Sequence, residues 1–212
     1  MVTTSVNIVT KMSVPPSSIT TIDRILNTVH TMLTDRGYTI TPKSKWKLGV
    51  SDVTDLKAVG ECKSTQDTVF VYFVTSDPKV QVKTIREYKT HMDEHKVRHS
   101  IIVYASQITS SSNSEITSDY DIETFKAKEL FENPTRHCLV PKHEKIKSDA
   151  DVQKVLDSYN LTSRTQLPRY DPSDIIVRYY HWELGSVVRI FRRFGKQREP
   201  EIYYRHVRDV GL

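Results

Sequence analysis

The sequence predicts two domains, an α/β domain followed by a small α+β domain. Two β-branched and aromatic runs flank an amphipathic helical pattern in the first half, which favours a strand, helix, strand unit with partly parallel pairing. Two alternating apolar runs near the end of the chain predict a pair of strands. Asn133-Pro134 lies between these halves, so we place the boundary there, between domains 20–132 and 133–212.

The chain begins with a predicted loose arm. Residues 1–19 contain Pro15-Pro16 and many serines and threonines without periodic apolar positions. From Thr20 onward, apolar residues recur at helical spacing, and Gly37 can supply the left-handed conformation that ends a helix. We therefore predict a helix that ends at Gly37 and a strand that begins over residues 38–40.

Strand and helix patterns alternate through the rest of the first domain. Residues 68–74 and 100–104 are apolar runs typical of buried strands, and a helix is predicted over 82–96 between them. The predicted buried face of that helix consists of Val82, Ile85, Tyr88 and Met92. Residues 108–119 are rich in serine and threonine, which predicts an exposed loop. Apolar spacing resumes over 121–131 and leads to the boundary.

The second domain opens with residues 137–143, where Pro141 fits only an edge strand or a strand end. Ser148-x-x-Asp151 can cap a helix that ends at Asn160. The predicted buried face of this helix consists of Val152, Val155, Leu156 and Tyr159. A short helix over 173–180 and strands over 186–191 and 202–207 follow, the strands being joined through Gly195 and Pro200. Gly185 is expected to supply a positive φ before the first of these strands.

Composition favours an intracellular protein. Cys62 and Cys138 match no redox or zinc spacing, which favours reduced thiols in a reducing compartment. No apolar run approaches the ~20 residues that span a bilayer, and the N-terminus lacks the features of a signal peptide. We therefore expect neither secretion nor membrane insertion.

The excess positive charge lies in the second domain. The chain has 31 Lys and Arg and 26 Asp and Glu; residues 1–132 carry 16 of each, and residues 133–212 carry 15 basic against 10 acidic residues. The densest cluster consists of Arg189, Arg192, Arg193, Lys196 and Arg198. It predicts a surface for an anionic partner, either nucleic acid or an acidic protein face, although a solvated hairpin explains any one of these charges equally well.

Short motifs follow one another in a fixed order along the chain. They are Thr34-Asp35-Arg36-Gly37-Tyr38, Val82-Lys83-Thr84-Ile85, His137-Cys138-Leu139-Val140-Pro141-Lys142-His143, Gln166-Leu167-Pro168-Arg169, Gly185-Ser186-Val187-Val188-Arg189-Ile190 and Tyr204-Arg205. Together they resemble one family, the fifth common subunit of eukaryotic RNA polymerases, whose archaeal counterpart is the small H subunit. The resemblance covers most of residues 20–207. Two departures stand out. Asp174-Ile175 stands where the family has Asp-Pro, while an Asp-Pro occurs earlier as Asp171-Pro172, so the proline has moved or been lost. The hairpin over 193–201 is more basic.

The resemblance implies a non-catalytic subunit of a multisubunit DNA-directed RNA polymerase, without a cofactor or metal of its own. It implies that the first domain has a restriction-endonuclease-like fold and acts as a jaw near downstream duplex DNA. The DNA-proximal residues would be Ser106, Gln107, Thr109, Ser110 and Ser111. The second domain would be an assembly module that binds the largest polymerase subunit, besides contacts with other subunits. The partner-binding residues would be His137, Leu139, Val140, Pro141, His143, Gln166, Leu167, Pro168, Arg169, Arg178, Arg192, Tyr204 and Arg205.

Two short motifs suggest enzymes instead. His91-Met92-Asp93-Glu94-His95 matches the pattern of inverted zinc peptidases, and His99 would continue the same helical face; a solvated charged helix explains it as well. Asp52 or Asp55, followed by Glu61-Cys62-Lys63, resembles the signature of Mg²⁺-dependent nucleases, in which two carboxylates hold the metal. This nuclease is the main alternative function, although a charged strand edge also explains the motif.

The sequence leaves the origin of the chain open. A cellular subunit of this class would act in the nucleus. A subunit encoded by a large DNA virus would act in a cytoplasmic viral factory or in the virion, and the basic hairpin is compatible with such a specialised version.

Overall fold

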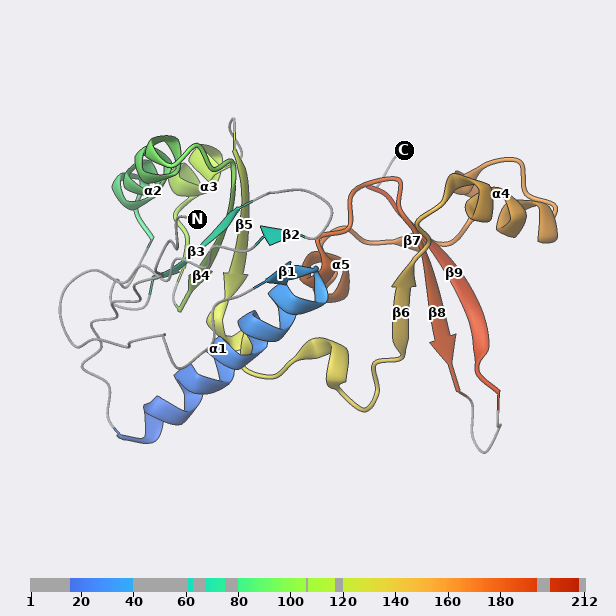
Figure 1. Ribbon diagram of the computed structural model, residues 1–212, viewed down its shortest axis with the longest axis horizontal. Helices are drawn as coiled ribbons and strands as arrows, with labels where there is room; N and C mark the ends of the chain where they lie inside the picture. Colours follow the sequence, from blue (N-terminus) through green and yellow to red (C-terminus); the bar gives the residue numbers. More distant parts are fainter. Residues whose placement is uncertain are drawn as a thin grey trace. The chain divides into compact units, whose positions relative to one another are not determined.

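The computed structural model describes residues 16–39, 61–62, 68–74, 80–105, 107–116, 120–193 and 199–209. The chain divides into two compact units, residues 1–132 and 133–212, here called the N-terminal and C-terminal units (Figure 1). Among the helices of the described ranges, none combines the length and apolar character required to cross a membrane.

Helix α1, Pro16–Asp35, is the first described element of the N-terminal unit. The residues buried along it include Ile25, Leu26, Val29, Met32 and Leu33, as the helical spacing predicted. The helix starts at Pro16, so it takes in the last residues of the predicted arm; proline is favoured at a first helical position because no N–H partner is needed there. Gly37 follows with φ of 94° and donates its N–H to the Thr34 carbonyl at 3.0 Å, which confirms the predicted cap.

Two sheets form in the N-terminal unit. Strand β1, Tyr38–Thr39, confirms the predicted strand after Gly37 and pairs antiparallel with β2, Glu61–Cys62. The larger sheet has the order β3-β4-β5 with parallel pairing throughout. Its strands are β3, Val69–Val74, β4, His99–Tyr104, and β5, Asp121–Lys126. Every residue of β3 is buried, so the prediction of a buried strand is confirmed.

Helix α2, Val82–Glu94, connects β3 to β4 and covers one face of the parallel sheet (Figure 1). Of its predicted buried face, Ile85, Tyr88 and Met92 are buried and Val82 is half-buried. The Tyr88 ring stacks on Tyr72 of β3 with the ring centroids 4.0 Å apart. The strand, helix, strand unit is therefore the one that the apolar pattern predicted.

The predicted exposed loop over 108–119 is wrong, because it contains helix α3, Ser110–Ile116. Ser112 and Ile116 are buried, and the Ser112 hydroxyl donates to the Val80 carbonyl at 2.9 Å. Thr109 caps the first turn, since its hydroxyl oxygen accepts the Ser112 N–H at 3.2 Å. These tertiary contacts offset the weak helix propensity of the serines. Figure 1 shows α3 beside α2.

The N-terminal unit ends with the 3₁₀ helix η2, Ala127–Leu130, directly after β5. Phe125 and Leu130 are fully buried, in line with the apolar spacing that resumes over 121–131. The guanidinium of Arg24 on α1 lies 4.9 Å from the centroid of the Phe131 ring. Helix α1 and this last segment therefore pack together.

A four-stranded sheet in the order β6-β8-β9-β7 forms the centre of the C-terminal unit. The strands are β6, Lys142–Lys145, β7, Arg169–Tyr170, β8, Val187–Arg192, and β9, Glu201–Val207. Strands β8 and β9 pair antiparallel, β6 pairs antiparallel with β8, and β7 runs parallel to β9. Pro141 directly precedes the edge strand β6, as predicted. Gly195 lies outside the described residues.

Helices cover both faces of this sheet. Helix α4, Asp149–Ser158, packs Val152 and Leu156 against Val187 of β8. Helix α5, Ile175–Tyr180, packs Ile176 and Val177 against Val188 and Ile190 on the opposite face. The adjacent residues Val187 and Val188 of β8 therefore belong to two different hydrophobic cores, because side chains alternate between the two faces along a strand.

Of the predicted buried face of α4, Val152 and Leu156 are buried and Val155 is half-buried, whereas the prediction for Tyr159 is wrong. This residue follows the last helical turn and is 54% exposed, with its ring centroid 5.9 Å from that of Tyr204. Ser148 occupies the N-cap position without a capping side-chain hydrogen bond, while two aspartates lie in the first turn. Asn160 has φ of 53° and ends the segment as predicted.

Gly185 provides the turn before β8. Its φ of 88° confirms the prediction, and its N–H donates to the Val207 carbonyl at 2.8 Å. A Cβ added there would meet no atom within 4 Å, so glycine is needed for its conformation rather than for space.

Candidate partner-binding surface

Residues 137–143 form the turn that leads into β6. The Leu139 N–H donates to His137 Nδ1 at 3.2 Å, and this turn leaves the Leu139 side chain 83% exposed. His143 is half-buried, and its Nδ1 donates to the Pro141 carbonyl at 2.7 Å. The segment therefore presents one large apolar side chain to solvent and fixes the next histidine against the sheet.

A groove of about 560 Å³, called the β6 groove below, lies between this turn and the end of β8. Its walls include Cys138, Leu139, Pro141, Lys142, Phe191, Arg192, Arg193 and Pro200. The Lys142 ammonium lies 5.4 Å from the centroid of the Phe191 ring, and the Arg192 guanidinium lies 5.4 Å from that of the Tyr203 ring. The β6 groove thus combines apolar walls with basic side chains that are held over aromatic rings.

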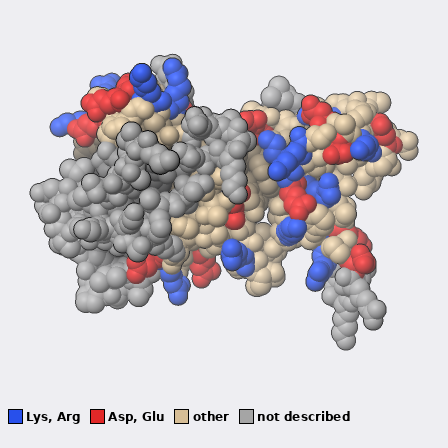
Figure 2. Space-filling view, viewed as in Figure 1, with Lys and Arg blue, Asp and Glu red and all other residues tan. Residues whose placement is uncertain are grey.

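Two histidines of the C-terminal unit, His143 and His206, have lowered pKa values. Burial lowers the pKa of His143, and the Pro141 carbonyl and the Asp174 carboxylate oppose only part of this effect. Burial also lowers the pKa of His206, with a smaller contribution from Arg208 and Arg164. The excess positive charge of this unit comes from its lysines and arginines, since residues 133–212 carry 15 basic against 10 acidic residues. On the face shown in Figure 2, basic and acidic side chains are interspersed over the C-terminal unit.

The Gln166 to Arg169 motif has internal roles in the structure. The Gln166 amide oxygen accepts the N–H groups of Thr162 at 2.7 Å and Ser163 at 3.1 Å. These bonds cap the N-terminus of the 3₁₀ helix η4, Arg164–Gln166. Leu167 is 4% exposed, so its side chain belongs to the core under α4. Arg169 forms an ion pair with Asp171. The motif therefore orders the chain before β7 and leaves only part of its surface to a partner.

Two aspartates hold the turn in which Ile175 stands at the family's proline position. Asp174 is the N-cap of α5 and accepts the Ile176 N–H at 2.8 Å, so Ile175 takes the first helical position. Asp171 accepts the Ser173 hydroxyl at 2.7 Å and the Ser173 N–H at 2.9 Å, and these bonds lower the pKa of the Asp171 carboxyl. The short helix therefore starts at a defined residue without proline. Arg178, on the same helix, is half-buried.

A second groove, of about 530 Å³, borders the outer side of β9. Its walls are Tyr159, Leu161, Gln166, Leu167, Pro168, Glu201, Ile202, Tyr203 and Tyr204. Arg205 points to the opposite face of the sheet, where its Nη1 donates to the Arg169 carbonyl at 2.9 Å and its guanidinium lies 5.9 Å from the Tyr170 ring centroid. Of the predicted partner-binding residues, three line the β6 groove, namely Leu139, Pro141 and Arg192. Four line this β9 groove, namely Gln166, Leu167, Pro168 and Tyr204. The others, which line neither groove, are His137, Val140, His143, Arg169, Arg178 and Arg205.

Two of the predicted DNA-proximal residues, Ser110 and Ser111, lie in helix α3 rather than in a loop. Ser106 lies outside the described residues, and Gln107 accepts the Val80 N–H on its carbonyl at 2.9 Å. Thr109 caps α3, while Ser110 and Ser111 are exposed in its first turn. The exposed hydroxyls that could contact DNA therefore belong to the first turn of a short helix.

The zinc-peptidase motif lies on α2, but its histidines have other partners. His91 Nδ1 lies 3.0 Å from the Tyr72 hydroxyl, and His95 Nδ1 donates to the His91 carbonyl at 2.9 Å. No third ligand completes a metal-binding cluster with this pair among the residues that the structure describes. The expectation that His99 continues the same face is wrong, because α2 ends at Glu94 and His99 is the first residue of β4.

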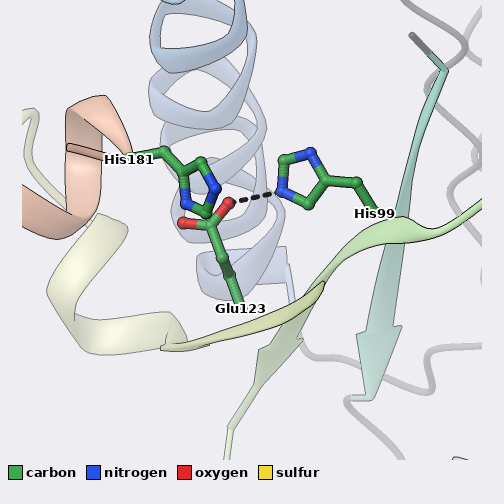
Figure 3. Close-up of side chains that lie close together, drawn as sticks. All are labelled: His99, Glu123 and His181. Atoms are coloured by element: carbon green, nitrogen blue, oxygen red, sulfur yellow. Dashed lines mark hydrogen bonds and ion pairs between the residues drawn. The ribbon is translucent and has the colours of Figure 1, made fainter. Parts of the chain in front are cut away.

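His99 belongs to a polar network inside the N-terminal unit. Its Nε2 lies 2.7 Å from Glu123 Oε1 on the neighbouring strand (Figure 3). Arg36 donates to both oxygens of Glu123, at 2.6 and 2.8 Å, and the two side chains are only 4% and 11% exposed. This bidentate pair ties the end of α1 to β5. His181, which Figure 3 also labels, is the left-handed residue that ends α5 in the C-terminal unit.

The nuclease motif falls largely outside the described residues. Asp52, Asp55 and Lys63 lie there, and Glu61 belongs to β2. The pairing of β2 with β1 is compatible with the strand edge that the sequence suggested.

Comparison with known proteins divides the chain at nearly the same place as the structure. Residues 132–207 match the family described as RNA polymerase Rpb5, C-terminal domain. Residues 23–133 match the family described as restriction endonuclease. The fold class predicted from the sequence, a restriction-endonuclease-like α/β domain followed by a small α+β domain, is thereby confirmed.

Relatives extend the similarity over most of the chain. DNA-directed RNA polymerases I, II, and III subunit RPABC1 is 32% identical over 189 residues in both Caenorhabditis briggsae and Caenorhabditis elegans, which covers 80% of this chain and 87% of each relative. The Dictyostelium discoideum protein of the same name is 31% identical over 177 residues, or 80% of this chain and 88% of the relative. The chain belongs to this RNA polymerase subunit family, as its motifs predicted.

Sequence reasoning missed several groove residues. Phe191, Tyr159 and Ile202 reach the two grooves only through cross-strand register and the end of a helix. The alternation of Phe191 with Val187 along β8 was the available signal, since it places both on one face. Alternation alone does not show which other elements of the fold lie beside that face and complete the groove.

Proposed function

We propose that the chain is a subunit of a multisubunit DNA-directed RNA polymerase and has no active site of its own. The observation that carries this proposal is a similarity to polymerase subunits that spans both units and 87% of the relatives' length. In addition, one ring nitrogen of His91 and one of His95 already take part in hydrogen bonds within the chain, which disfavours a zinc enzyme. A cellular version would act in the nucleus, and a viral version in a cytoplasmic factory or virion.

The C-terminal unit is the proposed assembly module, and the largest polymerase subunit is its proposed partner. The β6 groove supports this role because Leu139 is almost fully exposed beside basic residues that include Arg192. Exposed apolar side chains in a concave surface are typical anchors of protein interfaces. The other proposed contact residues are His137, Val140, Pro141, His143, Gln166, Pro168, Arg169, Arg178, Tyr204 and Arg205. The buried Leu167 would act by supporting its neighbours.

The N-terminal unit is the proposed jaw near downstream DNA. Gln107, Ser110 and Ser111 are exposed and can donate hydrogen bonds to phosphates, which positions DNA without reading its sequence. Residues 1–132 carry equal numbers of basic and acidic residues, so counterion release would contribute little affinity. We expect weak binding of duplex DNA by the isolated chain and contacts only inside the assembled enzyme.

Affinity purification of the tagged full-length chain, followed by mass spectrometry, tests the proposal. The expected result is co-purification of the largest polymerase subunit and other polymerase chains. Purification of the chain alone, or with unrelated proteins, would contradict it. A cleavage assay with duplex DNA and Mg²⁺ or Mn²⁺ tests the alternative nuclease, for which an Asp55→Asn variant is the control. Cleavage that this variant abolishes would establish the nuclease and remove the claim of a non-catalytic chain.

A further inference from the structure

Among the residues that the structure describes, one long side of strand β9 has no neighbouring strand over most of its length. Strand β8 pairs with β9 from Glu201 to His206, whereas β7 pairs with β9 only at His206 and Val207. The chain before β7 cannot extend this pairing by itself, because Pro168 has no N–H and its carbonyl already accepts the His206 N–H at 2.9 Å. The edge of β9 over 201–204 therefore remains open among the residues that the structure describes.

The direction of the backbone groups along this edge follows from the bonds nearby. The N–H groups of His206 and Arg208 donate to carbonyls of the β7 segment, while the intervening Val207 N–H donates to Ser186 on the β8 side. Because these directions alternate along a strand, Ile202 and Tyr204 point their N–H and C=O groups to the β7 side, away from β8. No partner for these four groups occurs within the described ranges.

The β9 groove lies along this same edge. Its volume of about 530 Å³ is bordered by Tyr159, Leu161, Ile202 and Tyr204, and Tyr159 and Ile202 are 54% and 42% exposed. The Tyr159 and Tyr204 rings meet edge to face, which gives one wall a fixed shape. An apolar groove beside unpaired backbone groups has the two features that an extended peptide needs.

We propose that the β9 edge binds an extended peptide segment of a partner protein, which adds a strand beside Ile202–Tyr204. Backbone hydrogen bonds to Ile202 and Tyr204 would hold the segment. Apolar side chains at alternate positions would enter the groove between Tyr159, Leu161 and Tyr204. The inference rests on the proposed function only for the identity of the partner, because the groove and the open edge belong to the chain itself.

A display library of random short peptides, selected on the isolated full-length chain, tests this inference without any polymerase. Enriched peptides are expected to carry apolar residues at every second position. Hydrogen exchange should then show that an enriched peptide slows exchange at the Ile202 and Tyr204 amides. The amides of Tyr203 and Arg205, which face β8, should exchange slowly with and without peptide.

The Ile202→Pro variant removes one outward N–H and places a ring at the edge, while the β8 ladder does not use that N–H. It should weaken peptide binding on the order of tenfold, whereas the matched Ile202→Val variant should bind like the wild type. Circular dichroism checks that both variants fold. If Ile202→Pro does not fold, the exchange pattern of the wild type decides alone.

Three results would overturn the inference. The first is that selection enriches no peptide. The second is that enriched peptides leave exchange at Ile202 and Tyr204 unchanged or bind the folded Ile202→Pro variant equally well. The third is a dimer of the isolated chain that Ile202→Pro converts to a monomer, since a second copy would then occupy the edge. Failure of the chain to co-purify with polymerase would leave these results unaffected, so the two proposals are tested separately.

Discussion

Replacement of Leu139 by alanine should weaken assembly without affecting the fold. The side chain is 83% exposed, so nearly all of its apolar surface is available for burial against a partner. Full burial of a leucine side chain contributes about 1.5–3 kcal/mol, and most of this is lost when alanine replaces it. A loss of about 2 kcal/mol corresponds to roughly a 30-fold lower affinity. Because Leu139 contributes little to the core, the melting temperature should stay unchanged.

A competition assay measures this effect directly. Wild-type and Leu139→Ala chains with different tags are expressed together, and their ratio is determined by mass spectrometry in polymerase purified through the largest subunit. Leu184→Ala is the matched control, since Leu184 is also exposed, at 55%, but does not line the β6 groove. Depletion of Leu139→Ala but not of Leu184→Ala is expected. Equal incorporation of all three chains would refute the assignment of the β6 groove as an anchor.

Three further predictions concern stability. The Arg36→Ala variant leaves the Glu123 carboxylate without the cation that it now contacts through both oxygens. The free energy of unfolding of the N-terminal unit should therefore decrease by about 3–5 kcal/mol, measured by hydrogen exchange of the β4 and β5 amides. An unchanged exchange rate would show that the pair is dispensable. Residues 133–212 alone should unfold in one cooperative thermal transition, because they contain two cores of their own, and a broad non-cooperative melt would argue against an independent unit. Because the pKa values of His143 and His206 are lowered in the folded state, the unfolded chain binds more protons once the pH falls below about 6.5. The free energy of unfolding of the C-terminal unit should therefore be constant above that pH and decrease below it, and the double His→Asn variant should show a smaller decrease.

The elements that the sequence predicted well have strong local signals. The run over 68–74 became β3 because its β-branched and aromatic residues suit only a strand that is buried on both faces. Gly185 and Asn160 mark positions where the chain needs positive φ, and few other residues accept that conformation. In these cases local preference and tertiary structure agree.

The wrong predictions arise where distant contacts override local preference. Helix α3 forms from serines because the Ser112 hydroxyl reaches the Val80 carbonyl, a contact between segments that are 32 residues apart. Tyr159 is exposed because α4 ends one residue earlier, so the helical spacing no longer directs its side chain toward the sheet. Neither fact is encoded in the spacing of apolar residues.

The candidate site was predicted at the level of motifs but not of geometry. The family resemblance included Leu139 and Arg192 among the partner-binding residues, and both line the β6 groove. The same reasoning grouped Leu167 with the contact residues, although its side chain is buried under α4. Motif membership does not separate a residue that meets a partner from one that supports its neighbour, because a family retains both.

The two edges of the C-terminal sheet are treated differently, and this difference bears on how the unit is used. Strand β6 is short, follows a proline and carries Lys142 and Lys145, which are devices that discourage pairing with another chain. The β9 edge has fewer of these protections over Ile202–Tyr204, since its exposed side chains there are apolar or aromatic. An open edge beside an apolar groove favours non-specific association in an isolated protein. Such an edge is tolerable when a specific partner covers it for most of the protein's lifetime, which is the situation of a subunit in a stable assembly. With both proposals, the β6 groove would supply a side-chain anchor and the β9 edge would supply backbone hydrogen bonds, so that one small sheet would hold a partner in two chemically different ways.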